Sequence, residues 1–82
     1  MTVYELIGNT FITDQTDIIV CSRYRIGNKI SEKSVRGQWF DDKILMRGTE
    51  TVKTFIYFAD RDELRITLKT VIIETEEAEN ET

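Results

Sequence analysis

Two groups of closely spaced carboxylates are the residues of this sequence best suited to chemistry. Asp60, Asp62 and Glu63 stand between two apolar runs, and Asp41 is followed directly by Asp42. Paired carboxylates can exchange a proton with a substrate or hold a divalent cation. Neither group belongs to a catalytic or metal-binding motif, and Asp is common in turns and in the first turn of helices. We therefore interpret the first group as a turn and the second as a helix start.

Other residues that commonly carry out catalysis are scarce. The sequence has no histidine and a single cysteine, Cys21, which lies in an apolar run and suits a small buried side chain. The four glycines are isolated from one another, so the sequence contains no glycine-rich phosphate loop. From this composition we expect a protein that is not an enzyme and that has no metal site and no cofactor.

The size and composition are those of one small folded domain. The chain has 82 residues, of which 40% are hydrophobic and 32% are charged. A chain of this length buries only about 60% of its unfolded surface, so a homodimer is a reasonable expectation. No apolar run approaches the ~20 residues of a membrane helix, and the first residues lack the pattern of a signal peptide. We expect a cytoplasmic protein with no membrane partner.

The negative charge is concentrated at the C-terminal end. The net charge is −4, yet residues 1–73 hold ten acidic and eleven basic side chains. The other five acids are glutamates within residues 74–82, a segment that contains no base. Such a segment cannot bury enough apolar surface to become ordered. We predict a single domain over residues 1–73 and an acidic, disordered tail over residues 74–82.

A short helix is predicted near the N-terminus. Thr2 and Glu5 have the spacing of a capping box, apolar residues follow at helical spacing, and Gly8 suits a helix end. This pattern predicts a helix over residues 3–7. The alternative is a hairpin over residues 3–13 that turns at Gly8.

The remaining regular elements are predicted to be strands. Residues 17–26 alternate between apolar and polar side chains, Gly27 and Asn28 supply a turn, and residues 29–35 return as a weaker strand. Residues 51–59 and 63–74 are rich in β-branched and aromatic side chains and flank the first carboxylate group. The fold class expected is α+β: a small antiparallel sheet of about four strands with a short N-terminal helix and a mid-chain helical turn.

The mid-chain segment, residues 38–48, carries the candidate partner-binding residues. Its two aspartates and the apolar residues after them predict the helical turn, although a loop with Trp39 in the core fits nearly as well. Trp39 and Phe40 stand near Arg36 and Arg47, and Trp and Arg are enriched at the hot spots of protein–protein interfaces. We take these four residues as the candidate partner-binding set. The alternative is that Trp39 packs in the core.

Alternation in the last hairpin assigns two faces. The residues expected on the core face are Val52, Thr54, Ile56, Phe58, Leu64, Ile66 and Leu68. Bases and aromatic side chains then interleave on the opposite face, an arrangement that can stack single-stranded bases and hold phosphates. The candidate nucleic-acid face consists of Arg23, Arg25, Phe55, Tyr57, Arg65 and Lys69. The simpler alternative is that Phe55 and Tyr57 pack against a helix.

Four stretches together resemble a known group of proteins: "TVYELI", "TDIIV", "DDKILMRGTETVKTF" and "DRDELRITL". Their apolar spacing is similar to that of small uncharacterised proteins encoded by bacteriophages and integrative mobile elements of Gram-positive bacteria. The resemblance covers residues 2–69. Residues 36–40 and the acidic extension after Glu74 depart from the pattern. The resemblance implies an accessory protein of a mobile element with a compact α+β fold and no known activity, and it carries over no functional residue.

The sequence and the resemblance together favour a non-catalytic binding protein of phage or mobile-element origin that engages a host macromolecule in the bacterial cytoplasm. The expected partner is a host protein, and inhibition of a defence or nucleic-acid-processing protein is the version we favour. One alternative is a small nucleic-acid-binding accessory protein that uses the basic and aromatic sheet face. Another is a self-assembling structural protein in which an exposed edge strand pairs between subunits.

Overall fold

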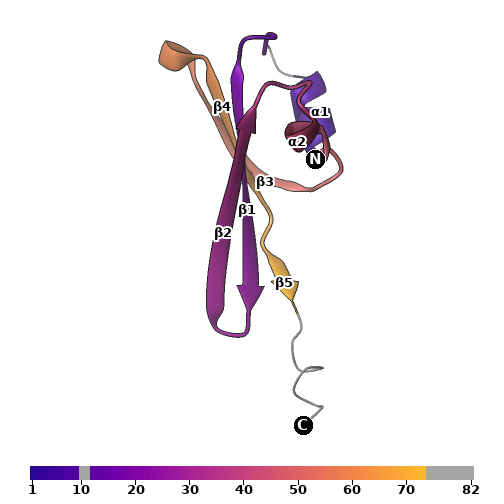
Figure 1. Ribbon diagram of the computed structural model, residues 1–82, viewed down its shortest axis with the longest axis vertical. Coiled ribbons are helices and arrows are strands. Elements are labelled where there is room, and N and C mark those ends of the chain that lie inside the picture. The colour runs from indigo at the N-terminus through magenta and orange to yellow at the C-terminus, as the bar shows by residue number, and fades with distance from the viewer. Residues whose placement is uncertain (10–11, 74–82) are drawn as a thin grey trace.

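The computed structural model describes residues 1–9 and 12–73, which form one sheet and two short helices (Figure 1). The elements are α1 (Val3–Gly8), β1 (Asp17–Ile26), β2 (Lys29–Gly37), α2 (Asp42–Leu45), β3 (Val52–Phe58), the 3-10 turn η1 (Ala59–Arg61), β4 (Glu63–Leu68) and β5 (Val71–Ile73). The α+β class is confirmed. The predicted tail, residues 74–82, lies outside the described residues. In the described part of the chain, no helix is long and apolar enough to cross a membrane.

The sheet has five strands and is mixed, which corrects the expectation of about four antiparallel strands. Its order is β2-β1-β4-β3, and β5 pairs with the far end of β1. β1 is antiparallel to β2, and β3 is antiparallel to β4. β1 runs parallel to both β4 and β5. β2 and β4 lie on opposite sides of β1, and the connection that contains α2 crosses from one side to the other. β4, which follows β3 along the chain, therefore runs in the same direction as β1.

α1 forms because its N-terminus is capped from both directions. The Thr2 side chain accepts a hydrogen bond from the Glu5 amide at 3.2 Å, and the Glu5 carboxylate accepts one from the Thr2 amide at 2.8 Å. These two bonds satisfy amides that the first helical turn leaves without partners. The predicted helix is confirmed. The alternative hairpin is wrong for residues 3–8, and its residues 10 and 11 lie outside the described residues.

The core lies between the two helices and one face of the sheet, which we call the inner face. Val3 and Leu6 of α1 and Ile44 of α2 are fully buried against it. The sheet residues of this core are Ile18, Val20, Leu64, Ile66 and Leu68. Each helix is too short to be stable alone, so this shared burial, rather than helix propensity, holds both in place.

We call the opposite face the outer face, and no helix of the described residues lies over it. Ile19 is nevertheless buried there, because its register partners on the two sides are Arg36 of β2 and Arg65 of β4. Long Arg side chains can cover an apolar neighbour with their methylene groups while the charged end stays in water. Ile19 therefore lies among charged residues on the outer face and is not part of the core.

The predicted faces are correct for β4 and wrong for most of β3. Val52 pairs with Leu68, but the next pair is Thr54 with Thr67, so Lys53 is an extra residue in a β-bulge. A bulge shifts the alternation of the strand by one residue. Three residues expected in the core therefore lie on the outer face, and Phe55 and Tyr57 take their places on the inner face. The three residues are Thr54, Ile56 and Phe58.

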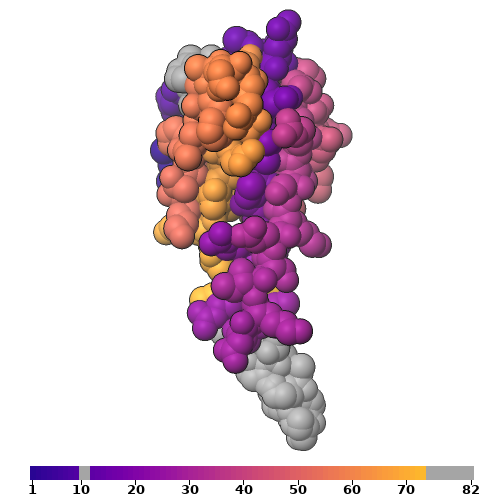
Figure 2. Space-filling model, turned by 90° about the vertical axis from the view of Figure 1, so that its left-hand side faces the viewer, coloured from indigo at the N-terminus to yellow at the C-terminus, as the bar shows by residue number. Residues whose placement is uncertain are grey.

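Beyond the core the sheet continues as a narrow arm, in which residues 24–26 of β1 pair with residues 29–31 of β2 on one side and with β5 on the other. Both helices lie at the opposite end of the sheet (Figure 1), and the molecule narrows toward the arm (Figure 2). Five apolar side chains of the arm are 40–63% exposed: Ile26, Ile30, Val71, Ile72 and Ile73. The arm thus carries apolar surface that the protein's own core does not cover.

Candidate functional site

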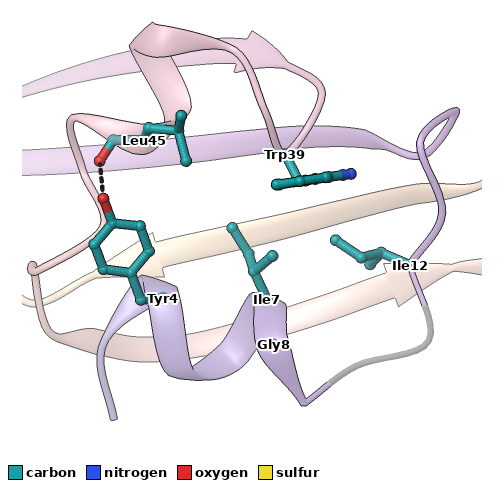
Figure 3. Close-up of a pocket in the computed structure, with 6 residues that line it drawn as sticks. All are labelled: Tyr4, Ile7, Gly8, Ile12, Trp39 and Leu45. Carbon is teal, nitrogen blue, oxygen red and sulfur yellow. Dashed lines mark hydrogen bonds between the residues drawn. The ribbon is translucent and has the colours of Figure 1, made fainter.

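An apolar groove lies between α1 and the segment that leads into α2 (Figure 3). Its volume is about 370 Å³, and most of its wall is apolar. The lining residues are Tyr4, Ile7, Gly8, Ile12, Trp39 and Leu45. We call it the α1–α2 groove. Its size is within the usual range for ligand-binding pockets.

Tyr4 forms one wall of the α1–α2 groove. Its hydroxyl donates a hydrogen bond to the Leu45 carbonyl at 3.2 Å, and its amide donates one to the Gly48 carbonyl at 2.9 Å. The ring lies so close to Gly48 that a Cβ at this position would overlap the ring atoms. Gly48 therefore lets the ring close over the end of the α2 segment, although the ring itself remains half exposed.

Trp39 forms the opposite wall, so the alternative of a ring packed in the core is wrong. It is 39% exposed, and its indole N–H donates a hydrogen bond to Asp14 at 2.8 Å. The Phe40 ring, which is also exposed, meets it edge-on with centroids 5.5 Å apart. The hydrogen bond and the edge contact fix the orientation of an aromatic ring that remains accessible to a partner.

The charged side chains of the segments around the groove are mainly acidic. Residues 1–9, 12–16 and 38–48 contain four carboxylates, those of Glu5, Asp14, Asp41 and Asp42, against the bases Lys43 and Arg47. The backbone hydrogen bond from Thr2 lowers the pKa of the exposed Glu5 carboxyl, which is therefore ionised at neutral pH. An apolar groove with an acidic surround suits apolar groups that carry positive charge nearby.

The two arginines of the candidate partner-binding set do not join Trp39 and Phe40 at the groove. Arg47 donates a hydrogen bond to Glu50 at 2.9 Å. This bond is the main cause that raises the pKa of Arg47, and a hydrogen bond with Tyr24 is the second. Arg36 lies on the outer face and donates to Asp17 at 3.1 Å. The structure therefore splits the set, since only the two aromatic residues share a surface.

Three arginines of the outer face surround one buried carboxylate, that of Glu63. Arg65 reaches its oxygens at 2.9 Å, Arg61 at 3.4 Å and Arg36 at 3.9 Å. The Arg61 guanidinium also lies 4.1 Å from the centre of the Phe58 ring. A buried carboxylate needs such partners to remain charged. These arginines thus have a structural task that sequence reasoning did not find.

The candidate nucleic-acid face is not a single face. Phe55 and Tyr57 lie on the inner side because their register partners are the core residues Ile66 and Leu64. Arg23, Arg25 and Arg65 lie on the outer face, where Arg23 pairs with Glu32 at 2.7 Å, and Lys69 follows the end of β4. The expected interleaving of these bases with these aromatic rings is therefore wrong, and the bulge at Lys53 is the reason.

The two groups of closely spaced carboxylates, Asp60–Glu63 and Asp41–Asp42, have structural tasks. Asp62 adopts a left-handed conformation with φ of 49° directly after η1, which confirms the predicted turn. Its side chain accepts hydrogen bonds from Tyr57 at 2.7 Å and from the buried Thr16 at 2.8 Å. Asp41 precedes α2 and accepts from the Gln38 amide at 2.9 Å, and Asp42 lies in the first turn. Among the described residues, no three carboxylates or thiols converge as a metal site would require.

Four lining residues of the groove were not identified from sequence: Tyr4, Ile7, Ile12 and Leu45. One signal was available for the first two. α1 has apolar side chains at four of its six positions, of which Val3 and Leu6 are buried, Ile7 is only partly buried against the same core and Tyr4 is half exposed. Tyr4 and Ile7 are three residues apart and therefore form a second apolar stripe beside the first. A short helix with two such stripes has more apolar surface than one core contact needs.

Comparison of the chain with protein-family models, with curated proteins and with solved structures gives no match to any of them.

Proposed function

We propose that this chain is a non-catalytic binding protein of phage or mobile-element origin, and that it engages a host protein through the α1–α2 groove. Inhibition of a defence or nucleic-acid-processing protein is the form of this function that we favour. The phage or mobile-element origin rests on the sequence resemblance alone. The binding role rests on one observation, which is the half-exposed Trp39 ring held in a fixed orientation at the wall of an apolar groove.

The fixed orientation of Trp39 is what favours binding over a purely structural role. Burial of a large aromatic ring against a partner's side chain yields much binding energy, and less entropy is lost when the ring is already held in place. The bond to Asp14 supplies that order without burying the ring. Tyr4, bonded to Leu45 on the facing wall, is ordered in the same way.

The surroundings of the groove define the chemistry of the partner segment. The wall is apolar, and the acids of the surrounding segments outnumber the bases. We propose that the bound segment inserts a large apolar side chain between Tyr4 and Trp39 and carries Lys or Arg beside it. Repulsion disfavours an acidic segment and nucleic-acid phosphates at this site.

A test uses short random peptides selected for binding to the purified chain. Trp39 is the only tryptophan, so its fluorescence reports directly on occupancy of the groove. We expect the selected peptides to share a large apolar residue flanked by bases and to change this fluorescence on binding. Replacing Tyr4 by Ala should weaken their binding at least tenfold, or about 1.4 kcal/mol.

Two controls make this test specific. Met46 is 78% exposed and does not line the groove, so Met46→Ala should leave binding unchanged. Ile72→Lys alters the arm at the other end of the sheet and should also bind like the wild type. Selected peptides that are acidic, or that bind Tyr4→Ala as tightly as the wild type, would remove the groove from the proposal.

A further inference from the structure

Among the described residues, no strand pairs with the outer edge of β5. β5 pairs with β1 on one side, and β3, which forms the edge beside β4, begins only at Val52. Next to β5 there is consequently a strand position that none of the residues 1–9 and 12–73 fills, and the start of β3 limits its upper end. Lys69 is at this limit, since its amide donates to the Thr51 carbonyl at 3.0 Å. We call this position the β5 slot.

β5 lacks the features that keep the other edges of the described sheet from pairing with another chain. β2 carries charged side chains at Lys29, Glu32, Lys33 and Arg36. β3 has the bulge at Lys53, and its first residue donates to the Met1 carbonyl at 2.8 Å. Charges, bulges and covering segments are the usual protection of edge strands. β5, with the sequence Val-Ile-Ile, has no charged side chain, no bulge and no covering segment among the described residues, so its short length of three residues is the one protection it has.

We propose that the β5 slot is filled by β5 of a second copy of this chain. The two strands run antiparallel around a twofold axis at Ile72, so that Ile72 faces its own counterpart and Val71 faces Ile73 of the second copy. Pairing of this kind is isologous and closes at a dimer. It joins the two arms into one continuous sheet, with the two cores at opposite ends.

The apolar surface of the arm fits this arrangement. The register with β1 places Tyr24, Ile26, Val71 and Ile73 on one face. Three of these four side chains are at least 40% exposed, and a hollow of about 300 Å³ lies among Tyr24, Ile26 and Ile73. In the dimer, the same residues of two copies meet across the new strand pair. Their shared burial stabilises the pair at roughly 25 cal/mol per Å² of apolar surface removed from water.

The charges at the two ends of the slot favour a second copy over an unrelated strand. The sequence directly after Ile73 contains five glutamates and no base. In the antiparallel arrangement, the C-terminal end of β5 in one copy points toward the Lys69 end of the slot in the other copy, and Lys69 and Lys53 are both exposed. The twofold axis repeats this relation, so the acidic charge that follows β5 in the sequence complements the basic charge of the facing end in both copies.

The first experiment tests the geometry by cross-linking. In a Cys21→Ser background, Ile72→Cys places two thiols opposite each other, at a separation that a disulfide can span. Mild oxidation should convert this variant to a covalent dimer. Ile30→Cys in the same background is the matched control, because Ile30 is equally exposed on the arm but lies in β2, and it should remain mostly monomeric. Equal cross-linking of both variants would overturn the proposal.

The second experiment measures assembly by sedimentation from about 1 µM to about 1 mM protein. We expect a monomer–dimer equilibrium that Ile72→Lys weakens at least tenfold and that Met46→Lys leaves unchanged. Deletion of residues 74–82, or added salt, should weaken the dimer several-fold, since both remove the attraction to Lys69 and Lys53. A monomer throughout, a dimer weakened by Ile56→Lys in β3 rather than by Ile72→Lys, or a dimer strengthened by the deletion would overturn the proposal.

Discussion

The hydrogen bond between Tyr57 and Asp62 connects β3 to the turn that follows it. Asp62 also accepts from Thr16, and its carbonyl accepts from the Asp17 amide at 3.0 Å, so the same residue holds the segment that enters β1. The bond to Asp62 is the main cause that raises the pKa of the Tyr57 hydroxyl above its ordinary value of 10.0. A single carboxylate thus organises one end of the sheet.

Tyr57→Phe tests this bond through its dependence on pH. A raised pKa in the folded state means that the contribution to stability is complete below pH 10 and is lost as the pH rises through the raised value. We expect Tyr57→Phe to be less stable than the wild type at neutral pH and the difference to shrink above pH 10. Urea unfolding of both proteins at neutral and alkaline pH measures it. A difference that stays constant or grows with pH would contradict this assignment.

At the residue scale, the sequence indicated the importance of Trp39 but not the surface it belongs to. Residue type alone suggested a binding hot spot, and the structure brings Trp39 together with Phe40. The sequence could not show on which face Arg36 lies, because the face of a strand residue depends on the register of the strand. It also could not find Tyr4, whose neighbour Gly48 is 44 residues away in the sequence.

α1 is the element on which the groove depends most, since it supplies Tyr4, Ile7 and Gly8. Thr2→Ala removes the side-chain acceptor for the Glu5 amide and should lower the free energy of unfolding by about 1 kcal/mol. Because fraying of α1 displaces Tyr4, the variant should also bind the selected peptides more weakly. Thr2→Ser keeps the acceptor and is the matched control in both urea unfolding and peptide binding. Equal stability of the Ala variant and the wild type would exclude a role for the cap.

At the element scale, prediction succeeded where the signal is local. Caps, turn residues and β-branched runs act within a few residues, and they gave α1, the β1–β2 turn and the turn before β4. Prediction of the β3 faces failed because of one extra residue at Lys53. No local pattern predicts this bulge, because the apolar and polar residues of the segment alternate equally well in a strand that has no bulge. The break between β4 and β5 was missed for the same reason, because Lys69 and Thr70 also fit an uninterrupted strand.

Local unfolding should require more free energy in some parts of the molecule than in others. Residues 18–20 and 64–68 lie in the middle of the sheet under the helices, whereas no described helix or strand lies over either face of the arm. We expect amide hydrogen exchange to be slowest in these two segments and fast in the arm of dilute protein. If β5 pairs with a second copy, exchange at residues 71–73 should slow as the protein concentration rises. Uniform protection along β1 at every concentration would contradict both expectations.

The arrangement of the strands was the least predictable feature at this scale. The sequence signals for a strand say nothing of its neighbours or of its direction. The parallel pairing of Val20 with Ile66 depends on a connection that crosses from one edge of the sheet to the other. The position of the open edge follows from the same crossing, so the candidate assembly surface could not be located before the topology was known.

α1 and α2, which flank the α1–α2 groove, lie at the opposite end of β1 from β5 (Figure 1). Copies linked through their arms would therefore keep both grooves free. On a partner that displays its segment repeatedly, the second attachment becomes an intramolecular event, and the gain in avidity can reach 10²- to 10⁴-fold without any new contact. A small protein of modest intrinsic affinity could in this way hold a multimeric target for a long time.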